Sequence, residues 1–229
     1  MDRIEYKIDL IKSKKIDFYK YLTKKKFKKL HESRIVNSIY FDNSSFEMYN
    51  DSIEGLIPRK KIRLRYYGHK NLDFIHKEAN LEIKYTNDTG RSKDTNKTTN
   101  TNSLLNFGLF DSKYGICYPK TFVSYKRNYY FINQFRITLD EDLSYSIFDK
   151  NLKTKKPVNS DEIIAEIKSD NKNEIDELKR LFPFKDTRFS KYCLSVEKLD
   201  LYWIFNDFKL HSNQRKGGWA GLNQRVANS

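Results

Sequence analysis

The stretch from 59 to 68 reads R-K-K-I-R-L-R-Y-Y-G, and it decides the fold. In an extended strand successive side chains point to opposite faces, so Lys61, Arg63 and Arg65 share one face and three apolar side chains share the other. By itself, this alternation is typical of a half-buried strand whose arginines face water. The second interpretation is that the arginines converge on a polyanion, and the rest of the chain has to decide between the two.

A second pattern, a glutamate followed two residues later by a lysine, recurs on three strand-like segments. The two charged residues of each pair share a face, and apolar residues lie on the opposite face. A longer segment rich in aromatic residues, 122–132, is joined by two residues to F-R-I-T-L-D at 135–140, which predicts a β-hairpin. The pairs are Glu5 with Lys7, Glu82 with Lys84, and Glu166 with Lys168.

This recurrence favours a sheet whose polar faces point inward. If each polar face looked outward, the charged pairs would be unrelated surface decoration on several strands. If the sheet closes into a barrel, the pairs meet in a charged tunnel and helices cover the apolar outside. Buried charges need partners, and an anion is expected to satisfy the excess of positive charge.

The composition limits the class of protein. The 229 residues suit one domain with a substantial core, because 15% of them are aromatic although 32% are charged. The formal net charge of +14 points to an anionic partner: nucleic acid, a phosphorylated molecule or polymer, or an acidic membrane surface. The two cysteines have no metal or redox spacing, and there is no signal-peptide pattern or apolar run of about 20 residues. We therefore expect a soluble, cytoplasmic protein.

The other segments divide into helices, strands and polar connections by their periodicity. Helices are expected at 14–30, 46–52 and 171–181, with a helical turn at 104–110. Strands are expected at 36–41 and 144–148, a mobile loop at the Thr- and Asn-rich tract 86–102, and a polar tail at 206–229. The histidines at 31, 69, 76 and 211 are scattered, so none is expected to be catalytic.

A set of short motifs resembles the VTC domain, the polyphosphate polymerase domain of the vacuolar transporter chaperone and its bacterial relatives. This family lies within the CYTH-like triphosphate tunnel metalloenzymes. The motifs run in the family's order over residues 3–195. They are R-x-E-x-K at 3–7, S-I-Y-F-D at 38–42, M-Y-x-D-x-I-E-G at 48–55, K-I-R-L-R-Y-Y-G at 61–68, L-E-I-K at 81–84, Y-x-R at 125–127, R-I-T-L-D at 136–140, A-E-I-K at 165–168 and R-F-S-K-Y at 188–192.

The resemblance implies an α+β fold, with an eight-stranded antiparallel β-barrel that forms a triphosphate tunnel and helices on its flanks, over residues 1–205. It implies catalytic roles for Arg63, Arg65, Lys84, Arg127, Arg136 and Lys191. The same residues would bind phosphate, together with Lys7, Tyr125, Lys168, Arg188 and Ser190. Glu166 would bind Mn²⁺ or Mg²⁺; Glu5 and Glu82 are weaker metal candidates, since each could pair with a neighbouring lysine or arginine instead.

The function implied is transfer of the terminal phosphoryl group of ATP to a growing polyphosphate chain. Arg3 stands where a triphosphatase of the superfamily would carry another glutamate, which favours the polymerase. The alternatives are a tripolyphosphatase or nucleoside triphosphatase on the same tunnel, and a non-catalytic protein that binds polyphosphate or nucleic acid. No nucleic-acid-binding motif supports nucleic acid as the ligand, and the polyphosphate-binding alternative stays open. A separate membrane protein that receives the product is a partner that the sequence leaves open.

Overall fold

The computed structural model describes residues 4–10, 12–68, 79–149, 156–169, 175–182, 184 and 187–201. Ten strands and five helices lie in this part of the chain. The strands are β1 (Ile4–Leu10), β2 (Lys28–Asp42), β3 (Arg59–Tyr67), β4 (Ala79–Asn87), β5 (Gly90–Thr98), β6 (Leu109–Asp111), β7 (Gly115–Ile132), β8 (Phe135–Ile147), β9 (Val158–Asn159) and β10 (Ile163–Ser169). The helices are α1 (Lys12–Lys24), α2 (Glu47–Glu54), α3 (Thr101–Phe107), α4 (Ile175–Leu181) and α5 (Lys191–Lys198).

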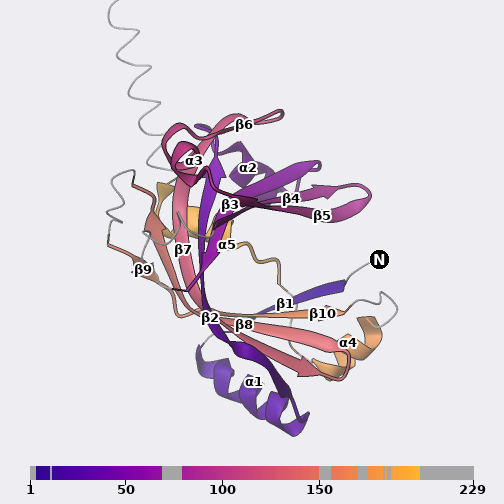
Figure 1. Ribbon diagram of the computed structural model, residues 1–229. Helices are drawn as coiled ribbons and strands as arrows, with labels where there is room; N and C mark the ends of the chain where they lie inside the picture. The colour runs from indigo at the N-terminus through magenta and orange to yellow at the C-terminus, as the bar shows by residue number, and fades with distance from the viewer. Residues whose placement is uncertain are drawn as a thin grey trace, which may run out of the picture.

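Eight of the strands form one antiparallel sheet in the order β1-β10-β8-β7-β2-β3-β4-β5, and β6 and β9 pair with β7 and β8. The sheet curls strongly, so β1 and β10 lie opposite the β4–β5 hairpin across the open side of the curve (Figure 1). Among the described strands, the edge strands β1 and β5 do not pair with each other. The predicted eight-stranded α+β fold is confirmed, in the form of a half-barrel.

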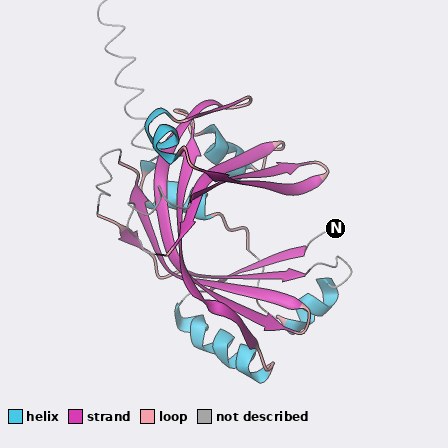
Figure 2. Ribbon diagram, viewed as in Figure 1, coloured by secondary structure: helices cyan, strands magenta, loops and turns pink. Residues whose placement is uncertain are grey.

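The convex face of one half of the sheet is apolar and is covered by α1. Phe18 and Leu22 of the helix are fully buried in one cluster with Ile137 of β8 and Ile167 of β10. Figure 2 shows this helix on the outside of the curve, away from the concave side. Burial of this stripe contributes about 2 kcal/mol for each large apolar side chain and leaves Lys14, Lys20 and Lys24 exposed to water.

The last helix, α5, packs on the concave face. Its Tyr192 ring stacks on the ring of Tyr40 with centroids 5.3 Å apart, and the hydroxyls of Ser195 and Thr121 lie 2.9 Å apart. The segment leading to α5 is tied to β1, because the amide of Thr187 donates to the carbonyl of Lys7 at 2.9 Å. The concave side therefore holds a helix at one end and remains open at the other.

Three sequence predictions were wrong. The tract 86–102 is not a loop, because 90–98 forms β5 and pairs with β4 along its whole length. The segment 144–148 is not a separate strand; it continues β8, which is irregular at Asp142, where φ is 54°. The first helix ends at Lys24 instead of 30, and β2 begins at Lys28.

The segment 170–174 and the tail 206–229 lie outside the described residues. Within the described part, no helix has the length and hydropathy needed to span a bilayer.

Candidate functional site

A glutamate shared by three cations lies on the concave face of β3 and β4. Arg63 and Glu82 are cross-strand partners, and the guanidinium donates from Nε to Oε2 at 2.7 Å. Arg65 Nη1 lies 3.5 Å from the same oxygen, and Lys93 Nζ of β5 lies 2.9 Å from Oε1. Burial alone would raise the pKa of Glu82, but the three cations lower it to about 2. The carboxylate thus stays ionised and holds both arginines in place.

Hydroxyl groups complete the surroundings of the two arginines. Arg63 Nη1 donates to Tyr40 Oη at 3.1 Å, Arg65 Nε donates to Ser38 Oγ at 3.2 Å, and Arg65 Nη2 donates to Tyr125 Oη at 3.3 Å. Because β2 and β7 supply these acceptors, the arginines point into the curve. The inward interpretation of the stretch 59–68 is therefore the correct one.

Three lysines lie side by side on adjacent strands next to these arginines. Lys84 of β4 is the cross-strand partner of both Lys61 and Lys93. Like charges in such a row repel, and burial with the nearby charge of Arg63 lowers the pKa of Lys84 to about 7. Glu166, Glu5 and Lys7 also act on this amine, so β4 faces β1 and β10 across the curve.

This lowered pKa predicts a pH dependence of anion binding. Lys84 is half neutral near pH 7 and must take up a proton to meet a phosphate, so the affinity for tripolyphosphate should fall between pH 7.5 and 9. The free energy of unfolding should instead rise with pH above about 7. In that range Lys84 is mostly protonated in the unfolded chain but mostly neutral in the folded one. Calorimetric titration in buffers of different ionisation enthalpy measures the proton uptake. Lys84→Arg, which stays charged, should abolish that uptake; persistent uptake in this variant would assign the proton to another group.

A second buried carboxylate, Asp140 of β8, joins β7 to α5. Arg127 donates to it through two nitrogens at 2.6 and 2.7 Å, and Lys191 Nζ lies 2.7 Å from Oδ2. Asp140 has no exposed surface, and although burial would raise its pKa, Arg127 and Lys191 lower it. The lysine also lies 4.8 Å from the ring centroid of Tyr125, next to Arg65. Asp140 therefore fixes two predicted phosphate ligands close to a third.

The strands β1, β10 and β8 form the facing wall. One row across β1, β10 and β8 consists of Lys7, Glu166 and Thr138. The next row with the same strand order consists of Glu5, Lys168 and Arg136. Glu166 makes an ion pair with Lys168, and Lys7 Nζ lies 2.9 Å from a Glu5 carboxylate oxygen. Burial would raise the pKa of Glu166, but Lys168, Arg127 and Lys7 hold it well below its usual range.

Comparison with known proteins agrees with this arrangement. The family model described as the VTC domain matches residues 4–112 and 93–200, which together span most of the chain. The chain belongs to the VTC domain family. A search of curated proteins returned no match.

Solved structures share the fold of this VTC domain at low sequence identity. A protein from Pyrococcus horikoshii is 17% identical, with a TM-score of 0.50, and the match covers 85% of this chain and 99% of that one. A Hippeastrum protein described as revealing a dominant triphosphatase activity is 13% identical, with a TM-score of 0.51, and the match covers 86% and 96% of the two chains. Together with the family match, they identify a triphosphate tunnel fold of the CYTH-like type.

Oxygen atoms of β8 and β10 suit a divalent cation in the VTC domain. The buried Oγ1 of Thr138 has no hydrogen-bond partner, and its cross-strand neighbour Glu166 is a buried carboxylate whose Oε1 makes the ion pair with Lys168. Mg²⁺ and Mn²⁺ prefer oxygen ligands and commonly take one or two carboxylates together with phosphate oxygens. Within the described residues, no group of three or more His, Cys, Asp or Glu side chains could hold a metal, so substrate oxygens would have to complete the site. Glu82, whose oxygens already contact three cations, is the poorer ligand.

Two predicted phosphate ligands of the VTC domain lie at the α5 end. Ser190 is the N-cap of α5, and its hydroxyl accepts from the amide of Cys193 at 3.3 Å. Arg188 is exposed and lies beside Gly55, at the end of α2. Roles in phosphate binding stay predictions for both residues, and the capping contact gives Ser190 a structural role as well.

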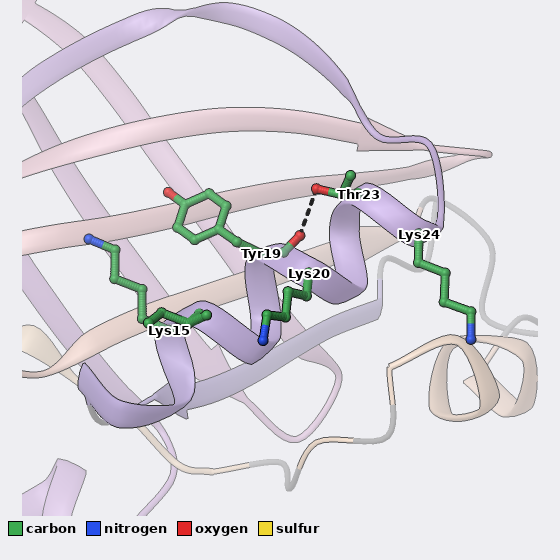
Figure 3. Close-up of a pocket in the computed structure, with 6 residues that line it drawn as sticks. Lys15, Tyr19, Lys20, Thr23 and Lys24 are labelled. Carbon is green, nitrogen blue, oxygen red and sulfur yellow. Dashed lines mark hydrogen bonds between the residues drawn. The ribbon is translucent and has the colours of Figure 1, made fainter.

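A shallow groove on α1 is separate from the concave site. Lys15, Lys20 and Lys24 line it with Ile16, and Tyr19 lies between them with its carbonyl accepting from Thr23 at 3.0 Å (Figure 3). None of the predicted phosphate ligands lines this groove. The lysine-rich side of the predicted helix is thus a solvated surface outside the curve.

Several residues of the site were missing from the sequence prediction. Tyr40, Lys93 and Asp140 lie with the predicted ligands on the concave face, and so does Lys61, which was predicted to share the face of Arg63 and Arg65 but was not named as a ligand. Asp140 could have been found, because it alternates with Arg136 and Thr138 on one face of a predicted strand. Lys93 could not, because its strand carries no apolar alternation.

Proposed function

We propose that this VTC domain binds a triphosphate on its concave face and transfers the terminal phosphoryl group of ATP to a polyphosphate chain. The observation that carries the proposal is the excess of positive charge on that face. Among the described residues, cations outnumber carboxylates there, and each of the four carboxylates named below already contacts at least one cation, so a bound polyanion would compensate the excess of positive charge. The cations are Lys7, Lys61, Arg63, Arg65, Lys84, Lys93, Arg127, Arg136, Lys168 and Lys191; the carboxylates are Glu5, Glu82, Asp140 and Glu166.

Phosphoryl transfer asks for positioning and charge compensation more than for covalent help from the protein. Arg63 and Arg65 would hold phosphate oxygens from one wall, while Arg127 and Lys191, fixed by Asp140, would hold them from another. Because these groups are already oriented by hydrogen bonds, little reorganisation would accompany the reaction. Glu166 and substrate oxygens would hold a divalent cation, which supplies neutralisation of the charge on the transferred group.

The protonation states support an anionic acceptor over water. Water must lose a proton when it attacks, whereas a polyphosphate oxygen is already an anion and needs no general base. Glu82, Asp140 and Glu166 all have pKa values held below the usual range by adjacent cations, so they are weak bases. The concave carboxylates therefore suit transfer to phosphate better than hydrolysis.

Hydrolysis is the second candidate, and Lys84 is the observation that favours it. With a pKa of about 7, its neutral amine could accept a proton from water near neutral pH. The triphosphatase activity described for the Hippeastrum protein belongs to the same fold. The two reactions differ only in the acceptor.

Incubation of the purified protein with ATP and Mn²⁺ or Mg²⁺, followed by gel separation of the products, tests the proposal. Long phosphate chains are the expected product. ADP with orthophosphate alone would establish hydrolysis and overturn the polymerase. Binding of ATP without turnover would leave a non-catalytic triphosphate-binding protein.

Removal of one arginine should weaken triphosphate binding measurably. Arg63→Ala should raise the Kd for tripolyphosphate about 5- to 150-fold, the equivalent of about 1 to 3 kcal/mol for a charge-assisted contact. Glu82 keeps Arg65 and Lys93 as partners in this variant, so it is not left unpaired. Isothermal titration calorimetry gives the Kd, and Lys126→Ala, an exposed cation on β7 that does not share the concave face, should bind as the wild type does. Equal affinities for the wild type and Arg63→Ala would remove Arg63 from the phosphate site.

A further inference from the structure

The first half of β2 adds a group of side chains to the concave face beyond the predicted ligands. In the register of β2 with β7, Lys28 is opposite Phe131, His31 is opposite Tyr129 and Arg34 is opposite Arg127. Directly opposed residues of an antiparallel pair point to the same face. The rows continue on β8 to Arg136, Thr138 and Asp140, which belong to the phosphate and metal walls described above.

Aromatic rings gather in these rows. His31 and Tyr129 make an edge-to-face contact with ring centroids 5.6 Å apart at 75°. Tyr67 at the end of β3 is 45% exposed, and its side chain lies close enough to Tyr129 to affect that phenol electrostatically. Burial raises the pKa of Tyr129, while Arg127 and Arg34, which form the next cross-strand pair of β7 and β2, lower it. We call Tyr67, Tyr129, Phe131, His31 and Arg34 the aromatic shelf.

The shelf is open to a ligand. His31 and Arg34 are exposed, and Tyr129 and Phe131 are half-buried, whereas the aromatic Tyr125 farther inside the curve is fully buried. Within the described residues, Arg34 makes no ion pair with a carboxylate. Planar rings and a guanidinium with free faces are the groups on which nucleobases stack.

The shelf also lies at a suitable distance from the phosphate ligands. Tyr129 follows Arg127 by two residues on the same face of β7, a separation of about 7 Å along a strand. Arg127 in turn lies near Tyr125, which accepts from Arg65. A chain of phosphates that ends at the arginines would therefore leave its other end at the shelf.

We propose that the aromatic shelf receives the base of a nucleoside triphosphate whose phosphates lie at Arg63, Arg65 and Arg127. This inference rests on the proposed function and adds to it the residues that separate a nucleotide from inorganic polyphosphate. The base stacks on Tyr129, with His31 supporting the ring from its edge and Arg34 covering the adjacent phosphate or the base. Because stacking does not depend on the pattern of hydrogen-bond donors, the shelf accepts purines broadly and favours them over pyrimidines through their larger rings.

The test compares two ligands that differ in the base. Calorimetric titration of the full chain with ATP and with inorganic tripolyphosphate, both with Mg²⁺, is made for the wild type, Tyr129→Ala and His31→Ala. Tyr129→Ala should weaken ATP binding about tenfold and leave tripolyphosphate binding within about twofold of the wild type. His31→Ala should show a smaller loss in the same direction, and Tyr129→Phe, which keeps the ring, should restore ATP binding. Tyr118→Ala, an exposed tyrosine at the other end of β7, is the matched control and should change neither affinity.

Three outcomes would overturn the shelf. An equal loss for ATP and tripolyphosphate in Tyr129→Ala would make these residues a phosphate subsite, and no loss for either would leave them without a ligand. A loss in Tyr129→Phe as large as in Tyr129→Ala would assign the effect to the hydroxyl instead of stacking. Failure of the wild type to bind either ligand would instead overturn the proposed function, and the shelf with it. Thermal melting of each variant by circular dichroism shows that the fold is kept.

Discussion

Replacement of Glu166 by glutamine should reduce metal-dependent turnover by about 100-fold or more, while the protein still folds. The carboxylate is buried on the concave face and held ionised by Lys168, Arg127 and Lys7, and the amide keeps its shape without its charge. A divalent ion that supplies several kcal/mol of charge stabilisation would lose its protein ligand, and each 1.4 kcal/mol corresponds to a factor of ten in rate. Turnover of ATP across a series of Mn²⁺ concentrations measures the effect.

Binding of Mn²⁺ measured directly separates a metal role from a purely electrostatic one. Electron paramagnetic resonance of free Mn²⁺ in the presence of tripolyphosphate should show weaker uptake by Glu166→Gln than by the wild type. Glu32→Gln is the matched control, since this carboxylate has 88% of its side chain exposed and pairs with Lys29, outside the concave site. Unchanged uptake and turnover in Glu166→Gln would place the metal elsewhere.

Replacement of Asp140 by asparagine should destabilise the protein by about 3 kcal/mol at pH 7. Loss of one member of a buried charge cluster leaves Arg127 and Lys191 close together without their common anion. The pKa of Asp140 is lowered in the folded protein, so its contribution is present above the unfolded pKa of about 4 and is lost as the pH falls below it. Urea unfolding of both proteins at several pH values should therefore show a difference that shrinks in acid.

A bound polyanion should reverse part of this loss. Saturating tripolyphosphate should raise the unfolding midpoint of Asp140→Asn more than that of the wild type, because phosphate oxygens take the place of the missing carboxylate between the same two cations. A conventional core substitution such as Leu139→Ala, on the opposite face of β8, should destabilise the protein without this extra response. Equal stabilisation of Asp140→Asn and the wild type would separate Asp140 from the phosphate site.

Much of the sheet could be predicted because alternation reports which face of a strand is buried. The stretch 59–68 and the three Glu-Lys pairs all lie in strands whose charged faces point into the curve. The periodicity could not show whether a charged face points into the curve or into solvent, because the same alternation of charged and apolar residues occurs in both cases. The recurrence of opposite charges and the ordered motifs resolved this ambiguity.

The errors arose where tertiary pairing overrides local preference. In β5 every position from 90 to 97 is exposed, so burial of side chains does not explain the strand. It forms because its backbone pairs with β4 along its whole length. In β8 the left-handed conformation of Asp142 lets one strand change direction without ending, so residues 144–148 were wrongly predicted as a separate strand. Only residues 28–30 of β2 were included in the predicted helix, because the run of lysines there gave no sign of where the helix ends.

The sheet order has a consequence for how the protein is made on the ribosome. The first strand pairs only with β10 among the described strands, and the contact between Lys7 and Thr187 joins the same two ends of the chain. During synthesis the backbone groups of β1 therefore stay unpaired until β10, near the end of the domain, has left the ribosome. A nascent chain can form the hairpins of β2 to β8 early, but it cannot hold a polyanion between two walls before the second wall is complete. Binding of a polyanion would consequently become possible only when β1 and β10 have paired, which is the last step in folding of the domain.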